Sequence, residues 1–337
     1  MQCSNISYFK IGRVPVGIGA ALKDWNITET VFRDRNRLHI VDFRAMTGEC
    51  PHNCFHCFTD KQKKTLAREE IFRVIDQVAE LGACTIDYLG EGETTIDPDF
   101  FPIIEYTTKK GIQPVIFTDA ATKMRDHDFV RRTFDSGASV VVKCDSLFNP
   151  GYQNWVVGDL KDRYFQARNE AVELLIREGF NAVDQEGTTR LGFDMVVSRL
   201  NMDEVEKTLR YCRKKNLWIV FAFYLPAGRS AGEDFDRTLP VTELEKQEIR
   251  SAIDRIDREF GFIHPICNNF GTMPCMELVQ IFGDGSVSPC PGNETVIGNI
   301  KTHSIREILD SILRRFPAHD PASFDGHCLY RPPLTRI

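Results

Sequence analysis

The 337-residue sequence predicts an α/β fold in which a partial (β/α)6 TIM-like barrel precedes a small α+β module. Six short runs rich in β-branched and aromatic residues predict strands, and amphipathic patterns between them predict helices. The alternation of strand and helix patterns ends near residue 230. We therefore expect an N-terminal extension at 1–37, the barrel at 38–230 and the small module at 231–337. Six units are fewer than the eight of a closed barrel, so we expect this one to stay open.

Each expected strand is short, and most are followed by a helical pattern. In 65–82, Ile71, Val74 and Val78 fall on one face at 3.6-residue spacing, and Gly82 ends the helix. A series of strand-then-helix units is typical of a parallel sheet with helices outside it. The expected strands are 38–43, 84–90, 114–119, 139–145, 191–197 and 218–224, and similar helical patterns fill 122–136, 162–178 and 203–216.

The C-terminal part has a different pattern. We expect helices at about 241–260 and 303–316, with a cysteine-bearing region between them. In "ELVQIFGDGSVSPC", Asp284-Gly285 separates two β-rich runs, which is a strong signal for a β-hairpin turn. The sequence thus predicts an α+β module built around one hairpin.

Composition excludes several classes of function. The net charge is −6 with both signs interspersed, unlike the basic footprint of a nucleic-acid-binding protein. No apolar run approaches the roughly 20 residues needed to span a bilayer, and no signal peptide opens the chain. We therefore expect a cytoplasmic protein without nucleic-acid or membrane partners. Because that compartment keeps thiols reduced, the clustered ones among the eleven cysteines point to metal binding.

The stretch "GECPHNCFHCFTD" (48–60) places Cys50, Cys54 and Cys57 directly after the first expected strand. An α/β barrel carries its chemistry at this end of its strands. A zinc knuckle would need a fourth ligand, which His52 or His56 could hardly supply in so short a loop. A [4Fe–4S] cluster can be held by three thiolates, which leaves one iron open for a small molecule. The loop therefore favours an iron–sulfur cluster.

The spacing Cys50-x3-Cys54-x2-Cys57 resembles the signature loop of the radical S-adenosylmethionine (SAM) superfamily. The resemblance covers roughly residues 38–230. It implies an enzyme whose open iron binds the amino and carboxylate groups of SAM. It also implies reductive cleavage of SAM to a 5′-deoxyadenosyl radical, which takes a hydrogen atom from a substrate. His56 stands where the family usually has an aromatic residue near the adenine.

A second motif, Gly90-Glu91-Gly92-Glu93, ends the second expected strand and resembles the family's GGE motif, with Glu91 replacing the first glycine. Small residues let a backbone approach the ammonium group of a ligand, and Glu93 can accept a charge-assisted hydrogen bond from it. The resemblance implies SAM or substrate contacts at later strand ends too, although each could equally be a capped helix start or a solvated loop. These positions are Thr118, Asp119, Lys143, Asp145, Ser146, Ser198 and Asn201.

A second cysteine set lies in the C-terminal module. Cys275 and Cys290 flank the expected hairpin, a spacing that resembles the auxiliary-cluster modules called twitch and SPASM. The tight CxxC-type run of a full SPASM module is absent after the hairpin, so we expect the shorter, single-cluster form. Cys328 and Cys267 are the remaining candidate ligands. Three thiolates with an open iron, a hydrogen-donor role for Cys267, and a zinc site remain alternatives.

The expected cofactors are thus SAM, the cluster that binds it, and an auxiliary [4Fe–4S] cluster that accepts an electron or anchors substrate. An electron donor such as flavodoxin or ferredoxin is implied. About 37 residues precede the first strand, so we expect no leader-peptide-binding domain and favour a sugar, aminocyclitol or nucleoside over a ribosomal peptide. Dehydrogenation and epimerisation both remain open. A non-enzymatic, zinc-stabilised binding protein is the alternative of another class.

Overall fold

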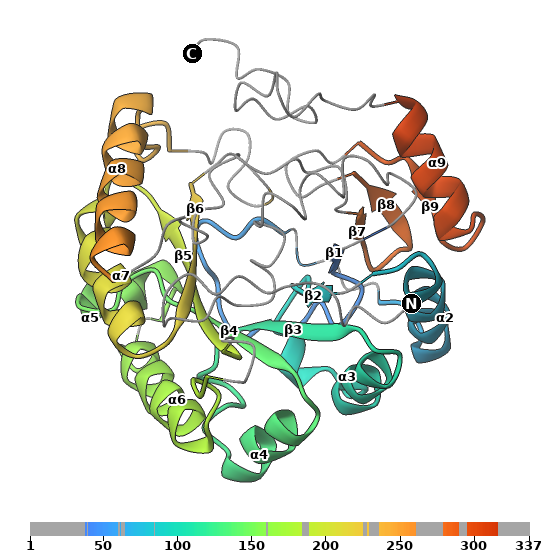
Figure 1. The fold of residues 1–337 in the computed structure, drawn as a ribbon, viewed down its shortest axis with the longest axis horizontal. Coiled ribbons are helices and arrows are strands. Elements are labelled where there is room, and N and C mark those ends of the chain that lie inside the picture. The colour runs from blue at the N-terminus through green and yellow to red at the C-terminus, as the bar shows by residue number, and fades with distance from the viewer. Residues whose placement is uncertain are drawn as a thin grey trace.

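The computed structural model describes residues 38, 40–59, 61, 65–83, 85–159, 161–183, 189–224, 228, 236–260, 279–289 and 295–315. Six parallel strands follow one another in chain order and curve into an open barrel with helices on its outer side (Figure 1). These strands are β1 (Ile40–Phe43), β2 (Thr85–Tyr88), β3 (Gln113–Thr118), β4 (Ser139–Lys143), β5 (Leu191–Val197) and β6 (Trp218–Phe223). The partial barrel is therefore confirmed.

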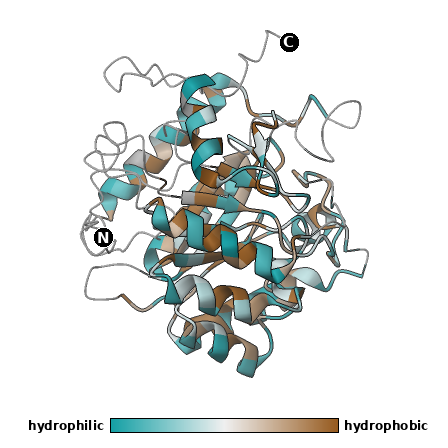
Figure 2. Cartoon of the chain, turned by 90° about the vertical axis from the view of Figure 1, so that its right-hand side faces the viewer, coloured by the Kyte–Doolittle hydropathy of each residue, from teal (hydrophilic) through white to brown (hydrophobic). Residues whose placement is uncertain are grey.

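The helices that cover the barrel begin and end where local chemistry predicts. Asp126 accepts a hydrogen bond from the Phe129 amide at the start of α4, and Gly179 ends α6 with a left-handed backbone. Hydrophilic and hydrophobic residues alternate along the helices, as expected for amphipathic helices (Figure 2). Their bounds are α2 (Arg68–Glu80), α3 (Phe100–Lys109), α4 (His127–Asp135), α5 (Pro150–Val156), α6 (Tyr164–Glu178), α7 (Val205–Lys214), α8 (Glu243–Glu259) and α9 (Ile305–Arg315).

Helices α3 and α5 were not expected from the sequence. Helix α5 has seven residues, too few to establish an apolar period, and begins at Asn149, whose side chain accepts from the Tyr152 amide. Two further short elements, η3 (Thr94–Ile96) and η4 (Met202–Glu204), are 3-10 turns at the starts of helical segments. Both α5 and η3 lie in loops at the carboxyl ends of strands, so they bear on the candidate site.

The sheet continues beyond β1 into the C-terminal module. Strand β7 (Val279–Ile281) pairs in parallel with β1, and β8 (Ser286–Ser288) and β9 (Gly298–Asn299) follow in antiparallel order. The expected turn is present, with Gly285 at φ +86° and the Ser286 amide donating to Asp284. The hairpin thus extends the barrel sheet from its first strand. Among the described strands, β6 and β9 are the two edge strands of the sheet, each paired with a neighbour on one side.

Apolar side chains fill the space between the sheet and the helices in two large clusters. One joins β1, β2 and β7 to α2, α3 and α9, and the other joins β4–β6 to α6–α8. Inside the barrel, Trp218 packs with Val115 and Val141. A Cβ at Gly192 would lie 2.3 Å from the Trp218 ring, so glycine there lets the indole lie against the neighbouring strand.

The barrel interior also contains two adjacent carboxyl groups. Asp42 on β1 and Asp87 on β2 are paired in register, and the Asp87 Oδ1 atom is buried without a hydrogen-bond partner. Burial raises the pKa of Asp42 to about 7, although the Arg44 guanidinium lowers it. Burial and the Asp42 charge raise the pKa of Asp87 well above its usual range. Burial inside the barrel therefore favours the protonated forms of Asp42 and Asp87.

These pKa shifts predict a pH-dependent effect for Asp87→Asn. A carboxyl group whose pKa is raised on folding stabilises the fold below its unfolded value of 3.8 and loses that contribution as pH rises through its folded value. Relative to the variant, the wild type should therefore lose on the order of 1–2 kcal/mol of stability between pH 5 and pH 8. Denaturant unfolding at both pH values measures this difference. Asp128→Asn, an exposed control, should show no such pH-dependent change, and a stability difference between the wild type and Asp87→Asn that is equal at both pH values would contradict the prediction.

Candidate active site

The three cysteines lie on the loop that leaves β1 at the carboxyl edge of the sheet. Cys50, Cys54 and Cys57 are free thiols and partly buried. Within the described ranges, no three His, Cys, Asp or Glu side chains form a site for a single metal ion. A [4Fe–4S] cluster has a different requirement, because each thiolate binds a separate iron. Burial raises the pKa of Cys54 to about 12, and coordination by iron would stabilise its thiolate form.

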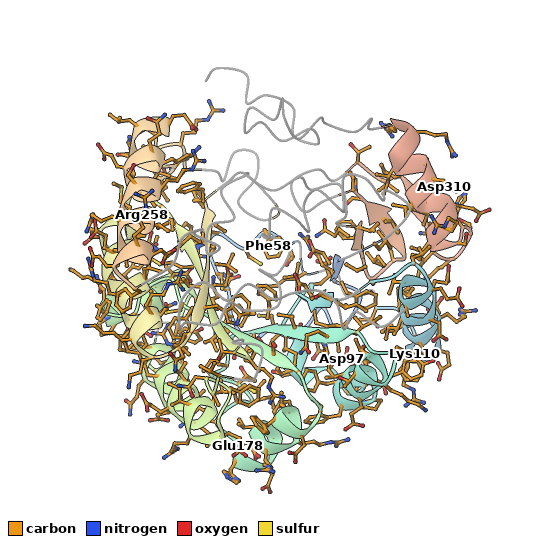
Figure 3. All side chains as sticks on the ribbon, viewed as in Figure 1. Phe58, Asp97, Lys110, Glu178, Arg258 and Asp310 are labelled. Carbon is orange, nitrogen blue, oxygen red and sulfur yellow. The ribbon has the colours of Figure 1, made fainter. Side chains whose placement is uncertain are left out.

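Helix α5 holds one side of this cysteine loop. The amides of Asn53 and Phe55 donate to the carbonyl oxygens of Val157 and Val156 at 3.0 and 3.2 Å. Gly158 has φ +70°, and a Cβ there would lie 3.1 Å from the Asn53 carbonyl oxygen. Phe58, at the far end of the loop, lies near the centre of the ring of strands (Figure 3). The end of α5 and the glycine after it were not predicted from the sequence. The Gly158-Asp159 dipeptide, a common turn signal, was the available indication.

The motif at 90–93 holds the other side of the loop. The Gly92 amide donates to the Thr47 carbonyl at 3.0 Å, and the Glu93 amide donates to the Glu49 carbonyl at 2.8 Å. A Cβ at Gly92 would lie 2.0 Å from the Glu49 oxygen. Gly90 has φ +67°, a conformation that favours glycine. The Glu49 backbone therefore fills the space beside Gly92, where we had expected a ligand to approach.

Glu91, which replaces the first glycine of the family pattern, is buried. Its carbonyl oxygen accepts from the Thr59 hydroxyl at 2.8 Å. The same hydroxyl lies 3.3 Å from the Cys57 sulfur. The Glu91 carbonyl therefore adds a third hydrogen bond between the motif and the cysteine loop.

Glu93 lies buried where β2 and β3 end side by side. Its Oε1 accepts from the Thr118 hydroxyl at 2.6 Å and from Thr95, and its Oε2 accepts from the Asp119 amide at 2.7 Å. Burial and the Asp119 carboxylate raise the pKa of Glu93 to about 8, and its hydrogen bonds oppose that rise. Asp119 also lies 2.9 Å from His52 Nε2. Two neighbouring carboxylates at the barrel mouth would be stabilised by a cationic group such as an ammonium.

A second charged group lies at the end of β4. Lys143 Nζ is 2.9 Å from Asp145 Oδ2 and 2.8 Å from His56 Nε2. Burial opposes the charge of Lys143, but the Asp145 carboxylate raises its pKa. Burial and the nearby Lys143 lower the pKa of His56 to about 3, so this imidazole is neutral and accepts from the ammonium. Lys143 also lies near enough to Cys54 to lower the pKa of that thiol.

Ser146, Ser198 and Asn201 lie beside this charged group but bind the protein itself. The Ser146 hydroxyl donates to Glu204 at 2.8 Å. The Asn201 amide donates to the backbone oxygens of Asp145 and Val196 at 2.7 and 2.9 Å, and its oxygen accepts from the Ser198 amide at 2.8 Å. These bonds fix the ends of β4 and β5. A direct role in SAM binding stays a prediction for all three.

The C-terminal cysteine predictions lie outside the described residues. Cys267, Cys275, Cys290 and Cys328 belong to this set, and their role as cluster ligands stays a prediction, as does the hydrogen-donor role of Cys267. The described part of this module contains the β7–β8 hairpin, which the sequence placed between Cys275 and Cys290.

The family comparisons agree with this fold and site. Residues 45–212 match the radical SAM superfamily model, and residues 275–328 match the SPASM model, an iron–sulfur cluster-binding domain. The chain therefore belongs to the radical SAM superfamily. It is an enzyme that uses SAM and [4Fe–4S] clusters. The SPASM match begins at Cys275 and ends at Cys328, and Cys267 lies outside it.

Solved structures share the fold at low sequence identity. Streptococcus suis SuiB bound to SAM has a TM-score of 0.61 and 13% identity, over 86% of this chain and 70% of that one. The anSMEcpe structure with bound SAM and a peptide has a TM-score of 0.61 and 16% identity, over 80% of each chain. No curated protein matches significantly. In the described part of the chain, no helix is long and apolar enough to span a membrane.

Proposed function

We propose that this enzyme oxidises a small, polar substrate bound in the barrel mouth by abstracting a hydrogen atom from it. In this proposal Cys50, Cys54 and Cys57 hold the cluster that binds SAM. When bound, that cluster supplies the electron that cleaves SAM to methionine and a 5′-deoxyadenosyl radical. Glu93 and Asp119 attract the ammonium group of SAM. An external one-electron donor, for example a flavodoxin or ferredoxin, is required.

The observation that carries the proposed substrate class is the polar interior of the barrel. Strand alternation turns Asp42, Asp87, Asp194 and Gln280 away from the apolar clusters that face the helices. Asp194 is close enough to Lys143 for the ammonium to lower its pKa, which burial raises to about 6. The carboxyl groups of Asp42, Asp87 and Asp194, on three interior strands, suit a ligand with hydroxyl or amino groups. Sugars, aminocyclitols and nucleosides are of this class.

The SPASM domain supports a net oxidation. After hydrogen abstraction, a substrate radical must lose one further electron and one proton to complete a dehydrogenation, and a [4Fe–4S] cluster in the SPASM domain would accept that electron. The same cluster could anchor the substrate instead. Epimerisation needs a hydrogen donor on the opposite face, for which Cys267 remains the candidate.

A peptide substrate is the second candidate, because of two structural relatives. SuiB has been solved bound to the precursor peptide SuiA, with a TM-score of 0.62 to this chain. The anSMEcpe structure, which matches 80% of this chain, contains a bound peptide. Both have at most 16% identity to this chain, so they show its fold and leave its substrate open.

The substrate class can be tested by measuring release of 5′-deoxyadenosine under anaerobic, reducing conditions. We expect aminocyclitols, sugars or nucleosides, supplied as separate panels, to raise the substrate-free rate by at least about tenfold, since substrate binding promotes productive SAM cleavage. Deuterium transfer from labelled substrate to 5′-deoxyadenosine would identify the abstracted hydrogen. Stimulation by peptides alone would overturn the small-molecule proposal and favour the second candidate.

A further inference from the structure

Arg44 lies where the barrel meets the C-terminal hairpin. Its amide donates to the Ile281 carbonyl at 2.8 Å, which continues the β1–β7 pairing by one residue. The side chain is only 2% exposed. A fully charged group with so little exposure needs specific partners, because removing it from water is costly. Partners in two different segments of the chain bear on its role.

The first partner is Phe58 of the cysteine loop. The Arg44 guanidinium carbon lies 4.2 Å from the centre of the Phe58 ring, within the range of a cation–π contact. Phe58 directly follows Cys57. Its backbone is also crowded by Gly228, which follows β6: a Cβ at Gly228 would lie 2.2 Å from the Phe58 carbonyl carbon. The residue after the third cysteine is thus held from both the β1 and the β6 sides of the open barrel.

The second set of partners lies on the hairpin. With its amide oriented to satisfy both neighbours, the Gln280 side-chain oxygen accepts from the guanidinium of Arg44, and its nitrogen donates to Ser288 at 3.1 Å. Gln280 is on β7 and Ser288 on β8, so this chain of hydrogen bonds crosses the hairpin. Phe282, the residue after β7, has its ring centre 5.4 Å from the guanidinium carbon.

We propose that Arg44 is a positioning residue that fixes the SPASM hairpin against the cysteine loop and thereby sets the spacing of the two clusters. One face of its planar guanidinium stacks on Phe58, and its edge donates to Gln280. An ammonium group keeps the charge but has neither the plane for stacking nor the paired donors. Charge compensation of Asp42, whose pKa Arg44 lowers, would need only the positive charge. Arg44→Lys keeps the positive charge but removes the stacking plane and the paired donors. It therefore distinguishes a positioning role of Arg44 from charge compensation of Asp42.

The test compares Arg44→Lys and Arg44→Met with Arg132→Met in the reconstituted holoenzyme. Arg132 also stacks on an aromatic ring, at 4.0 Å from the centre of Phe101, but on the outer surface. Two readouts are used: hydrogen exchange of the amides in 279–288, and the magnetic coupling between the two reduced clusters by pulsed EPR. Neither readout requires substrate.

We expect Arg44→Lys to retain both clusters, to exchange the hairpin amides about tenfold faster, and to broaden or shift the inter-cluster coupling. Arg132→Met should match the wild type in both readouts. Wild-type exchange and coupling in Arg44→Lys would overturn the proposal, even if Arg44→Met fails to fold. A wild-type protein that holds only the SAM-binding cluster would also overturn it. Faster exchange with unchanged coupling would overturn it too, since Arg44 would then only stabilise the hairpin.

Discussion

Cys54→Ala should abolish the release of 5′-deoxyadenosine from SAM under reducing conditions. Cys54 lies centrally in the loop that also carries Cys50 and Cys57, and the remaining two thiolates would not retain a cluster with an open iron. We therefore expect iron content to fall from about eight to about four atoms per chain, because the auxiliary cluster would remain. Anaerobic reconstitution, iron analysis and product quantification measure both effects. The loss of activity should be complete.

The matched control is Cys212→Ala. Cys212 lies on α7 within the apolar cluster between the sheet and its outer helices, away from the strand ends. This variant removes one sulfur from the core and should cost about 1 kcal/mol of stability or somewhat more, with iron content and SAM cleavage retained. If Cys54→Ala still cleaved SAM at a wild-type rate, the assignment of the cysteine loop as the cluster site would be wrong.

The barrel strands were predictable because their signal is local. The apolar runs at 114–119 and 191–197 correspond to β3 and β5 within one residue, and turn residues delimit them. The pairing of β7 with β1 was not predictable, since about 235 residues separate the strands and no local pattern specifies a partner across that distance. Helix α5 was missed because its seven residues, about two turns, are too few to show an apolar period.

In the candidate site, too, features with a local sequence signal were predictable and contacts between distant segments were not. Glu93 and Asp119 were each predicted from their places at the ends of expected strands, but their contact with each other was not. It arises because the carboxyl ends of neighbouring parallel strands lie at one edge of the sheet. Sequence could not show that the amide of Asn201 would be used to join the ends of β4 and β5. It also gave no signal for Arg44, because a charged residue after a strand is usually a solvated loop residue. Its burial results from β7 and Phe58, which come from distant parts of the chain.

Gly92→Ala should remove the SAM-binding cluster while leaving the barrel folded. A Cβ at this position would lie 2.0 Å from the carbonyl oxygen and 2.5 Å from the carbonyl carbon of Glu49, the residue before Cys50. These contacts are with backbone, which has no alternative rotamer. The hydrogen bonds from Gly92 and Glu93 to Thr47 and Glu49 draw the two loops together and prevent the added methyl group from simply moving aside.

Overpacking of this kind costs about 1–3 kcal/mol when the structure relaxes, and here the relaxation must displace the backbone that carries the first cysteine. We expect iron content to fall to about four atoms per chain, since the auxiliary cluster is retained, and SAM cleavage to fall by at least about 100-fold. Gly151→Ala is the control, because its Cβ would meet only the Asn149 side chain, at 3.6 Å. Full iron content and activity in Gly92→Ala would show that the cysteine loop does not depend on this contact.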